Sequence, residues 1–312
     1  MDYIVFDLEW NQSASGKRNA NKKMPFEIIE IGAVKLNSDM QEIGRFNELV
    51  RPKVYKNINR ITGNIVHLDM KQLEKARSFR DVMNDFLKFC GKDFLFCTWG
   101  NLDLIELQRN MRFHRMEPLS VEPIKFLDVQ KIFALQLEGK KSQHTLEYAV
   151  DICSIKKDIA FHRALADAYY TAKVLAYLKP EYRKRYSFDT YVLPKEKKQE
   201  VRILFDDYYK YISREFENKA KALGDREVLY SGCYLCKRPV SRKIRWFTPN
   251  NKHYYCVSYC GKHGYIKGKI RLRRTEDGKV YVVKTMKQIS EAQMLEIREK
   301  SEKIKNQEQT GL

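Results

Sequence analysis

The first apolar run of the chain, residues 3–10, carries two carboxylates near its end, Asp7 and Glu9. Side chains two residues apart on a β-strand point to the same side of the sheet, so this run places the two carboxylates next to each other. Each raises the pKa of the other unless a cation lies between them. Because carboxylates and phosphate oxygens bind hard divalent cations such as Mg²⁺, the pair predicts metal-dependent phosphoryl chemistry. The alternative is two solvated charges at a strand end.

Two later carboxylates have contexts that fit such a site. Asp103 follows the apolar run 94–97 and a tight turn, and it falls in the first turn of a predicted helix. Asp167 lies in an alanine-rich predicted helix. The helix dipole alone could explain an acidic residue at either helix N-terminus. His162 precedes Asp167 by five residues and is a candidate general base, because the pKa of imidazole lies near neutrality; a helix cap is the alternative.

In this order, these residues resemble the three motifs of the DEDDh family of 3′–5′ exonucleases. The motifs are Asp7-x-Glu9, Asp103 behind Trp99-Gly100, and His162 with Asp167. Supporting stretches resemble the family's second and third strands, its ITG loop and the segment that follows: residues 27–34, 46–52, 61–65 and 76–79. The resemblance covers about residues 1–180 and is nearest to the KapD-like and Eri-type exoribonuclease branch. Two features depart from the family pattern: the basic loop 11–23 and the pair Val66-His67.

The resemblance implies an α/β domain with a ribonuclease H-like mixed sheet flanked by helices. It implies two Mg²⁺ or Mn²⁺ ions held by four carboxylates, with a histidine as the base that activates water: Asp7, Glu9, Asp103 and Asp167, with His162. The reaction is then metal-dependent 3′–5′ hydrolysis that releases nucleoside 5′-monophosphates. The residues expected to contact nucleic acid in this domain are Trp10, Thr62 and Trp99.

Hydrophobic periodicity supports the same architecture. Strands are expected at residues 3–8, 27–37, 42–50, 94–98 and 123–128. Helices are expected at residues 78–90, 101–113, 143–151 and 162–178. Three successive strands followed by alternating helices and strands indicate a mixed sheet with helices on both faces.

Four of the seven cysteines form two close pairs in the second half of the chain. Cys233 and Cys236 make a C-x2-C pair, Cys256 and Cys260 follow, and His263 lies three residues beyond Cys260. Such pairs are typical of a structural zinc site, so we expect one Zn²⁺ in a small zinc-ribbon-like C-terminal domain. The fourth ligand is either Cys256 or His263. Unrelated thiols or a disulfide pair are the alternative.

Positive charge is concentrated around these cysteines. The chain has a formal net charge of +19, and residues 231–290 contain 15 Lys and Arg but only 2 Asp and Glu. Such a concentration predicts a polyanionic partner, and aromatic residues among the cations suit stacking on unpaired bases. The residues expected to bind nucleic acid are Arg238, Arg242, Lys243, Arg245, Lys267, Lys269 and Arg271. Trp246 is expected to be a packing residue instead.

These patterns divide the chain into four parts. Residues 1–180 are the exonuclease domain, and 181–227 are a helical connector, since apolar residues recur at helical spacing within a helix predicted over 195–222. Residues 228–286 are the basic zinc module, with strands at 267–274 and 279–284. Residues 287–312 are a charged helix and tail.

The sequence also bears on location. No apolar run approaches the roughly 20 residues that a membrane span needs, and the first strand begins too early for a cleaved signal peptide. Cys90, Cys97 and Cys153 lie in apolar surroundings typical of buried free thiols. We therefore expect a reducing, cytoplasmic compartment and no membrane partner.

The favoured function is a 3′–5′ exonuclease that acts on single-stranded RNA 3′ ends. A single-stranded DNA exonuclease has the same motifs. A catalytically idle RNA-binding protein and a proofreading subunit of a polymerase are further alternatives.

Overall fold

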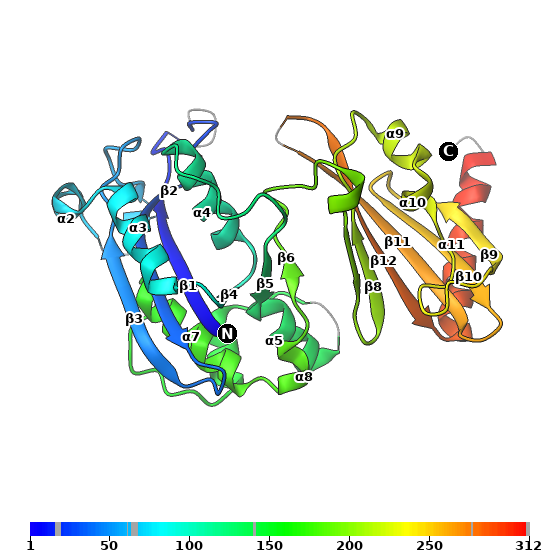
Figure 1. Cartoon of the computed structure of the whole chain (residues 1–312), viewed down its shortest axis with the longest axis horizontal. Coiled ribbons are helices and arrows are strands. Elements are labelled where there is room, and N and C mark those ends of the chain that lie inside the picture. Colours follow the sequence, from blue (N-terminus) through cyan, green and yellow to red (C-terminus); the bar gives the residue numbers. More distant parts are fainter. Residues whose placement is uncertain (16–19, 61, 64–67, 140–141, 276, 310–312) are drawn as a thin grey trace. The chain divides into compact units, whose positions relative to one another are not determined.

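The chain divides into two compact units, Met1–Val192 and Leu193–Leu312, each with its own sheet and its own core (Figure 1). The computed structural model describes residues 1–15, 20–60, 62–63, 68–139, 142–275 and 277–309. Within these residues, no helix is both long and apolar enough to cross a membrane.

The first unit is built on a six-stranded mixed sheet in the order β3-β2-β1-β4-β5-β6. The strands are β1 (Asp2–Asn11), β2 (Glu27–Leu36), β3 (Glu42–Leu49), β4 (Phe94–Thr98), β5 (Lys125–Asp128) and β6 (Ser187–Phe188). β1 lies in the interior of the sheet, antiparallel to β2 and parallel to β4. This is the predicted ribonuclease H-like arrangement, and the first five strands agree with their expected ranges within a few residues.

Helices cover both faces of this sheet. They are α2 (Met70–Lys75), α3 (Phe79–Cys90), α4 (Leu102–Phe113), α5 (Val129–Glu138), α6 (Leu146–Ile152), α7 (Ala164–Tyr177) and α8 (Pro180–Arg183). Side chains of α3 and α4 pack in one core cluster, whereas those of α5, α6 and α7 pack in a second. Helix α5 was not among the predicted helices, although Asp128 caps its first turn and left-handed Gly139 ends it.

The alternation of β1 determines where its carboxylates point. Ile4, Phe6 and Leu8 belong to the core cluster with α3 and α4, and Val5 belongs to the cluster with α7. Residues of one parity share a side of the sheet, so Asp7 and Glu9 extend the side of Val5, toward the face that α7 covers.

A glycine allows α7 to approach the sheet closely at this point. Gly32 on β2 lies opposite Asp7, and a Cβ added to it would overlap the backbone of Ala164 and Leu165 in the first turn of α7. Glycine is the residue that permits such an approach. The start of α7, which carries Asp167, therefore lies directly against the strand pair that carries the other carboxylates.

The second unit is a six-stranded antiparallel sheet in the order β7-β8-β12-β11-β10-β9. Its strands are β7 (Val201–Leu204), β8 (Tyr208–Ile212), β9 (Ser241–Phe247), β10 (His253–Cys260), β11 (Gly264–Arg274) and β12 (Val280–Ile289). Its helices are η2 (Lys197–Gln199), α9 (Lys219–Gly224), α10 (Arg226–Leu229) and α11 (Glu291–Gln309). The predicted strands at 267–274 and 279–284 and the charged terminal helix are confirmed. The sheet around the cysteines is larger than a small ribbon.

The prediction of a helix over residues 195–222 is wrong. That segment forms β7 and β8, and only α9 at its end is α-helical. The physical reason is that its apolar residues are mainly aromatic or β-branched, and Asp206-Asp207 breaks the run between them. Tyr211 and Ile212 are fully buried because β8 pairs with β12. The predicted connector is thus part of the second sheet.

Gly32→Ala should destabilise the first unit and reduce any activity that depends on Asp167, because the added methyl group must push the backbone of α7 away from β2. Overpacking of this kind costs about 1–3 kcal/mol. Thermal unfolding and metal-dependent activity measure the two effects. Gly44→Ala is the matched control on β3, since its methyl group meets side chains and no backbone, with the Phe89 ring nearest at 3.2 Å. Equal stability of the two variants would contradict the close approach.

Candidate metal centres

Three of the four predicted carboxylates come together at the end of β1. Asp7 and Glu9 from β1 and Asp167 from α7 have carboxylate oxygens that all lie within 4.8 Å of one another. Strand alternation brings the first two together, and the close packing of α7 on Gly32 brings the third. Residues that are 160 positions apart in sequence therefore form one acidic group.

Asp103 lies beside this group. It is 6% exposed in the first turn of α4, and the backbone N–H of Leu8 donates a hydrogen bond to its carboxylate. Of the charged neighbours that raise the pKa of Asp7, Asp103 makes the largest contribution. The predicted tight turn before α4 is present, with Gly100 at φ 100°.

Burial and nearby negative charge raise the pKa of all four carboxyl groups. Burial contributes most in each case, followed for Asp7 and Glu9 by the charges of the other acids. The pKa of Glu9 rises to about 8, that of Asp103 to about 7 and that of Asp167 to about 6. The pKa of Asp7 is raised well above its ordinary value. Carboxylates this crowded favour protons or cations at the site.

A buried ion pair anchors the start of α7. The guanidinium of Arg163, which precedes α7, donates two hydrogen bonds of 2.8 and 2.9 Å to Glu30 on β2, whose side chain is fully buried. Glu30 lies opposite Glu9 in the strand register. The pair cross-links α7 to β2 near the acidic group, and its positive partner lowers the pKa of Glu9 in opposition to the other effects.

His162 lies at the edge of the acidic group on an unusual backbone. It is exposed, has a left-handed conformation with φ 68°, and donates its backbone N–H to Asp167 Oδ1 at 3.3 Å. Left-handed backbone is uncommon for residues other than glycine. The preceding segment is held by Tyr170, which stacks on Phe161 and hydrogen-bonds to both backbone groups of Ile159.

The donor set fits hard divalent cations. It consists of carboxylate oxygens only, which are the ligands that Mg²⁺ and Mn²⁺ prefer. The raised pKa values show that the group is electrostatically unfavourable when it is ionised without a cation. The four carboxylates are therefore suited to hold the predicted metal ions.

The structure distinguishes the three predicted nucleic-acid contacts of this unit. Thr62 is 7% exposed, and its hydroxyl donates to the backbone carbonyl of Trp10. Trp10 is half-buried and packs on Phe26. Trp99 is also half-buried, and its indole N–H donates to the carbonyl of His144. The remaining ITG-loop positions Ile61, Asn64 and Ile65, the pair Val66-His67 and residues 16–19 of the basic loop lie outside the described residues.

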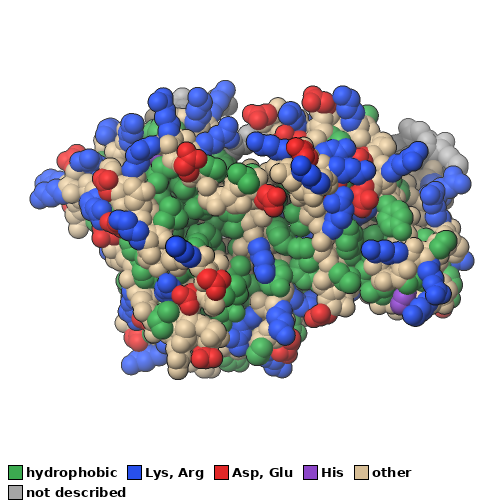
Figure 2. All heavy atoms as spheres, viewed as in Figure 1, with side chains coloured by type: hydrophobic (Ala, Val, Ile, Leu, Met, Phe, Trp, Pro, Cys, Tyr) green, Lys and Arg blue, Asp and Glu red, His purple; other side chains and the backbone are tan. Residues whose placement is uncertain are grey.

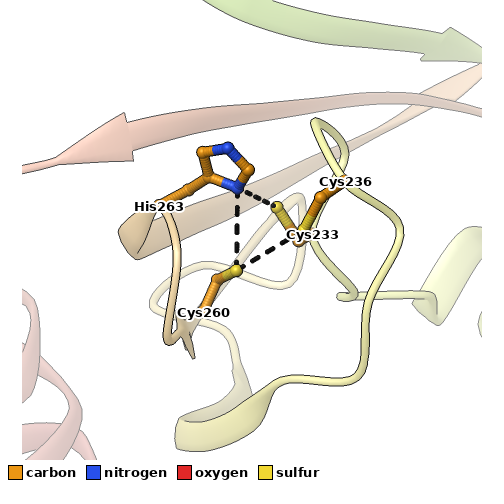
Figure 3. A group of neighbouring side chains, drawn as sticks. All are labelled: Cys233, Cys236, Cys260 and His263. Atoms are coloured by element: carbon orange, nitrogen blue, oxygen red, sulfur yellow. Dashed lines mark hydrogen bonds between the residues drawn. The ribbon is translucent and has the colours of Figure 1, made fainter.

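A second cluster is formed by Cys233, Cys236, Cys260 and His263, whose side chains point toward one another (Figure 3). The Sγ atoms of Cys236 and Cys260 are 3.7 Å apart, and His263 Nδ1 lies 3.3 Å from Cys233 Sγ and 3.7 Å from Cys260 Sγ. Tetrahedral Zn²⁺ with Zn–S bonds of about 2.3 Å places its sulfur ligands roughly 3.8 Å apart. The four donors therefore fit zinc.

Hydrogen bonds favour the thiolate form of Cys260. Burial alone would raise the pKa of Cys260, but the backbone N–H groups of Lys262 and His263 donate to its sulfur, and together with the side chains of His263 and Cys236 they lower the pKa to about 6. The thiolate is the form that binds zinc.

Cys256 lies outside the cluster, so the structure favours His263 as the fourth ligand. Cys256 and Cys260 are four residues apart on β10, a separation of about 13 Å along a strand. Cys256 is 3% exposed and packs under Gly268 beside Trp246, and burial raises its pKa to about 12. The indole of Trp246 donates to the carbonyl of Leu229, in agreement with a packing role.

The predicted basic residues fall into two groups, and Lys and Arg side chains are spread over the face of the second unit that Figure 2 shows. Lys267, Lys269 and Arg271 alternate along β11 with the buried residues Ile266, Gly268 and Ile270, so they share one face of the sheet. The other group lies on or next to the edge strand β9, and all its members are exposed: Arg238, Arg242, Lys243 and Arg245.

Three residues that build the acidic site were not predicted from the sequence: Gly32, Glu30 and Arg163. The sequence does contain a pattern that could have identified Glu30, because this acid interrupts an apolar strand in which its neighbours are buried. A buried carboxylate requires a cationic partner. Nothing local in the sequence identifies that partner as Arg163.

Comparisons with known proteins agree with this geometry. A family model described as exonuclease (RNase T) matches residues 4–175, more than half of the chain. The PolC-type DNA polymerase III of Thermotoga petrophila is 30% identical over 152 residues, covering 47% of this chain and 10% of the polymerase. The probable 3′–5′ exonuclease KapD of Bacillus subtilis is 27% identical over 114 residues, covering 36% of this chain and 54% of that protein. The chain thus spans about half or less of these relatives' lengths.

Among solved structures, this chain is similar to the nuclease domain of 3′hExo, a DEDDh family member bound to rAMP. The TM-score is 0.48 with 19% sequence identity, and the match covers 56% of this chain and 90% of that domain.

Asp7→Asn should stabilise the protein in the absence of divalent cations at about pH 8. The raised carboxyl pKa values mean that the folded chain binds more protons than the unfolded chain between about pH 4 and 8, so stability falls as the pH rises through this window. Replacing one buried ionisable carboxyl group by a neutral amide should raise the unfolding midpoint by about 2–4 °C, the shift for ~1 kcal/mol in a unit of this size.

Added Mn²⁺ should raise the midpoint of the parent more than that of Asp7→Asn. A parent protein whose midpoint is unaffected by both pH and Mn²⁺ would contradict a cation site at the acidic group.

Cys236→Ser should lose the stoichiometric zinc and destabilise the second unit, because metal binding contributes directly to folding in such sites. Cys256→Ala is the matched control, since this thiol packs in the core away from the cluster, and it should retain zinc. Elemental analysis of the purified chains measures both. Zinc retained in Cys236→Ser, or lost in Cys256→Ala alone, would refute the ligand set.

Proposed function

Because this chain belongs to the exonuclease family of RNase T, as its motifs predicted, we propose that it is a metal-dependent 3′–5′ exonuclease that shortens RNA. The observation that carries the proposal is the convergence of Asp7, Glu9 and Asp167 at the end of β1, with Asp103 beside them. Four crowded carboxylates with raised pKa values are an arrangement that holds divalent cations against a phosphodiester.

Asp7, Glu9, Asp103 and Asp167 would hold the cations, and neighbouring residues fix the positions of these four carboxylates. Divalent cations, when bound, neutralise charge on the scissile phosphate and lower the pKa of the attacking water. Asp7 and Glu9 contribute from a rigid central strand, and Asp103 is held in place by the N–H of Leu8. The Arg163–Glu30 pair fixes the start of α7 and therefore the position of Asp167.

His162 is the proposed general base. It is exposed beside Asp167, where a water attacking a bound phosphate could give it a proton. The oxygen of that water bonds to phosphorus, the bond from phosphorus to the 3′ oxygen breaks, and the leaving 3′ oxygen takes up a proton. The products are a nucleoside 5′-monophosphate and a chain that is shorter by one nucleotide.

The choice of RNA rests on the resemblance to the KapD-like and Eri-type branch. The basic surface of the second unit supports a single-stranded polyanion in general, because Lys and Arg contact phosphates without reading the sugar. A cytoplasmic, reducing compartment is part of the same proposal.

A second candidate is a DNA 3′–5′ exonuclease. The observation that favours it is the 30% identity over 152 residues to a PolC-type DNA polymerase III. Both candidates require the same four carboxylates and differ in the sugar that the site accepts.

The test is a time course on 5′-labelled single-stranded RNA and DNA of matched sequence, with Mn²⁺ and without added divalent cation, alongside Asp7→Asn. We expect a metal-dependent ladder of 3′-shortened products on RNA, a weak ladder on DNA, and none with Asp7→Asn. An equal or stronger ladder on DNA would select the second candidate. Binding without cleavage of either substrate by the parent chain would replace the enzyme with an idle binding protein.

His162→Asn should slow turnover by about 10²–10⁴-fold, the usual contribution of a general base, and leave metal-dependent substrate binding intact. Asparagine is chosen because it tolerates the left-handed backbone of this position, which alanine does not. Single-turnover rates and binding titrations separate the two effects. Normal turnover in this variant would remove His162 from the mechanism.

A further inference from the structure

A groove lies between α11 and the sheet of the second unit. It has a volume of about 390 Å³, within the roughly 300–1,000 Å³ typical of ligand pockets. Ile297 of α11 packs on the sheet and forms one side. The sheet side is formed by Phe247 and Tyr255, which lie opposite each other on β9 and β10.

The two aromatic rings are arranged as a partly open platform. Phe247 and Tyr255 have centroids 6.0 Å apart with an interplanar angle of 40°, and both side chains are half-buried. Tyr255 lies opposite Lys269 in the strand register, and the Nζ atoms of Lys267 and Lys269 lie 5.5 and 5.7 Å from its ring centroid. The platform therefore combines stacking surface with positive charge.

Lysines surround this platform. Lys267 lines the groove from β11, and Lys300 and Lys303 line it from α11. Burial, followed by the charges of Lys269, Lys300 and Lys287, lowers the pKa of Lys267, whereas Glu296 acts in the opposite direction. Such crowding of cations is relieved when an anion binds between them.

We propose that this groove binds unpaired nucleotides of a single-stranded polynucleotide, with a base stacked on Tyr255 and Phe247 and neighbouring phosphates on Lys267, Lys300 and Lys303. Any unpaired base can stack on an aromatic ring, and lysines bind phosphates without sequence preference. The inference deepens the proposed function and rests on it, because it assigns a second contact with the same substrate strand outside the acidic site.

Charge complementarity selects this occupant over an apolar peptide. The described residues that line the groove include three lysines and no carboxylate. A peptide helix or strand would bury those ammonium groups without partners, whereas each phosphodiester carries one permanent negative charge.

The test measures binding in the full chain carrying Asp7→Asn, without chelator, so that neither hydrolysis nor loss of zinc interferes. The probe is a 5′-fluorescein-labelled single-stranded oligouridylate, followed by anisotropy as a function of salt. Tyr255→Ala tests stacking, and Tyr255→Phe is its control because it keeps the ring. Lys300→Glu with Lys303→Glu tests the charge, and Arg298→Glu with Lys305→Glu is its matched control on the same helix, at exposed positions that do not line the groove.

We expect Tyr255→Ala to weaken binding about 10-fold and Tyr255→Phe to bind as the parent does. The double substitution of Lys300 and Lys303 should make the negative slope of log K against log salt shallower by about 1.4, the value for two phosphate contacts on a single strand. Parent-like binding by both Tyr255→Ala and the double variant at Lys300 and Lys303 would refute the proposal that the groove binds a single strand. An equal loss of affinity in the control variant at Arg298 and Lys305 would also refute it. So would a duplex of the same length that competes with the probe as well as a single strand does.

The two proposals fail separately. A chain with intact Asp7 that hydrolyses neither RNA nor DNA, but binds oligouridylate through Tyr255, refutes the exonuclease and leaves the groove. A chain that hydrolyses RNA but binds the probe independently of Tyr255 refutes the groove alone.

Discussion

Repulsion among carboxylates at the end of β1 is the constraint on which the first unit depends. Asp7 and Glu9 are adjacent because they are two residues apart on a strand, and the fold adds Asp103 and Asp167 to them. Other contacts hold the carboxylates together against this repulsion: Gly32 lets α7 pack closely on the sheet, and Glu30 binds Arg163 at the start of α7. Burial and the neighbouring negative charges raise the pKa of these carboxyl groups, and a bound cation would favour their ionised form.

The second unit presents the opposite charge. Its sheet carries a row of cations along β11, and its thiols and His263 converge at the turn after β10. An acidic centre that requires cations and a basic surface that requires anions suit one ligand, a phosphodiester chain, in different ways. Under the proposed function, the acidic centre would act on one phosphate at close range, whereas lysines and aromatic rings would hold a flexible strand with little regard to its sequence.

Local patterns predicted much of the first unit correctly. Strand alternation and helix periodicity depend on neighbours in sequence, so the first five strands and helices α3, α4, α6 and α7 lie within a few residues of their predicted ranges. Residues 195–222 were predicted wrongly because Val201, Leu204 and Tyr208 fit a helical period by spacing alone. These residue types favour β-strands, and the segment forms strands because β8 pairs with β12, which is distant in sequence.

The sequence by itself determined the chemical groups of each site: paired carboxylates on a strand, further acids at helix starts, and cysteines in close pairs. These depend on residue type and short spacing. Only the tertiary structure decided which of them meet. It placed Asp167 beside Asp7 through the contact of α7 with Gly32, and it paired Glu30 with Arg163. It also brought His263 rather than Cys256 to the other three cysteines, because an extended strand separates Cys256 from Cys260 whereas a turn returns His263 to it.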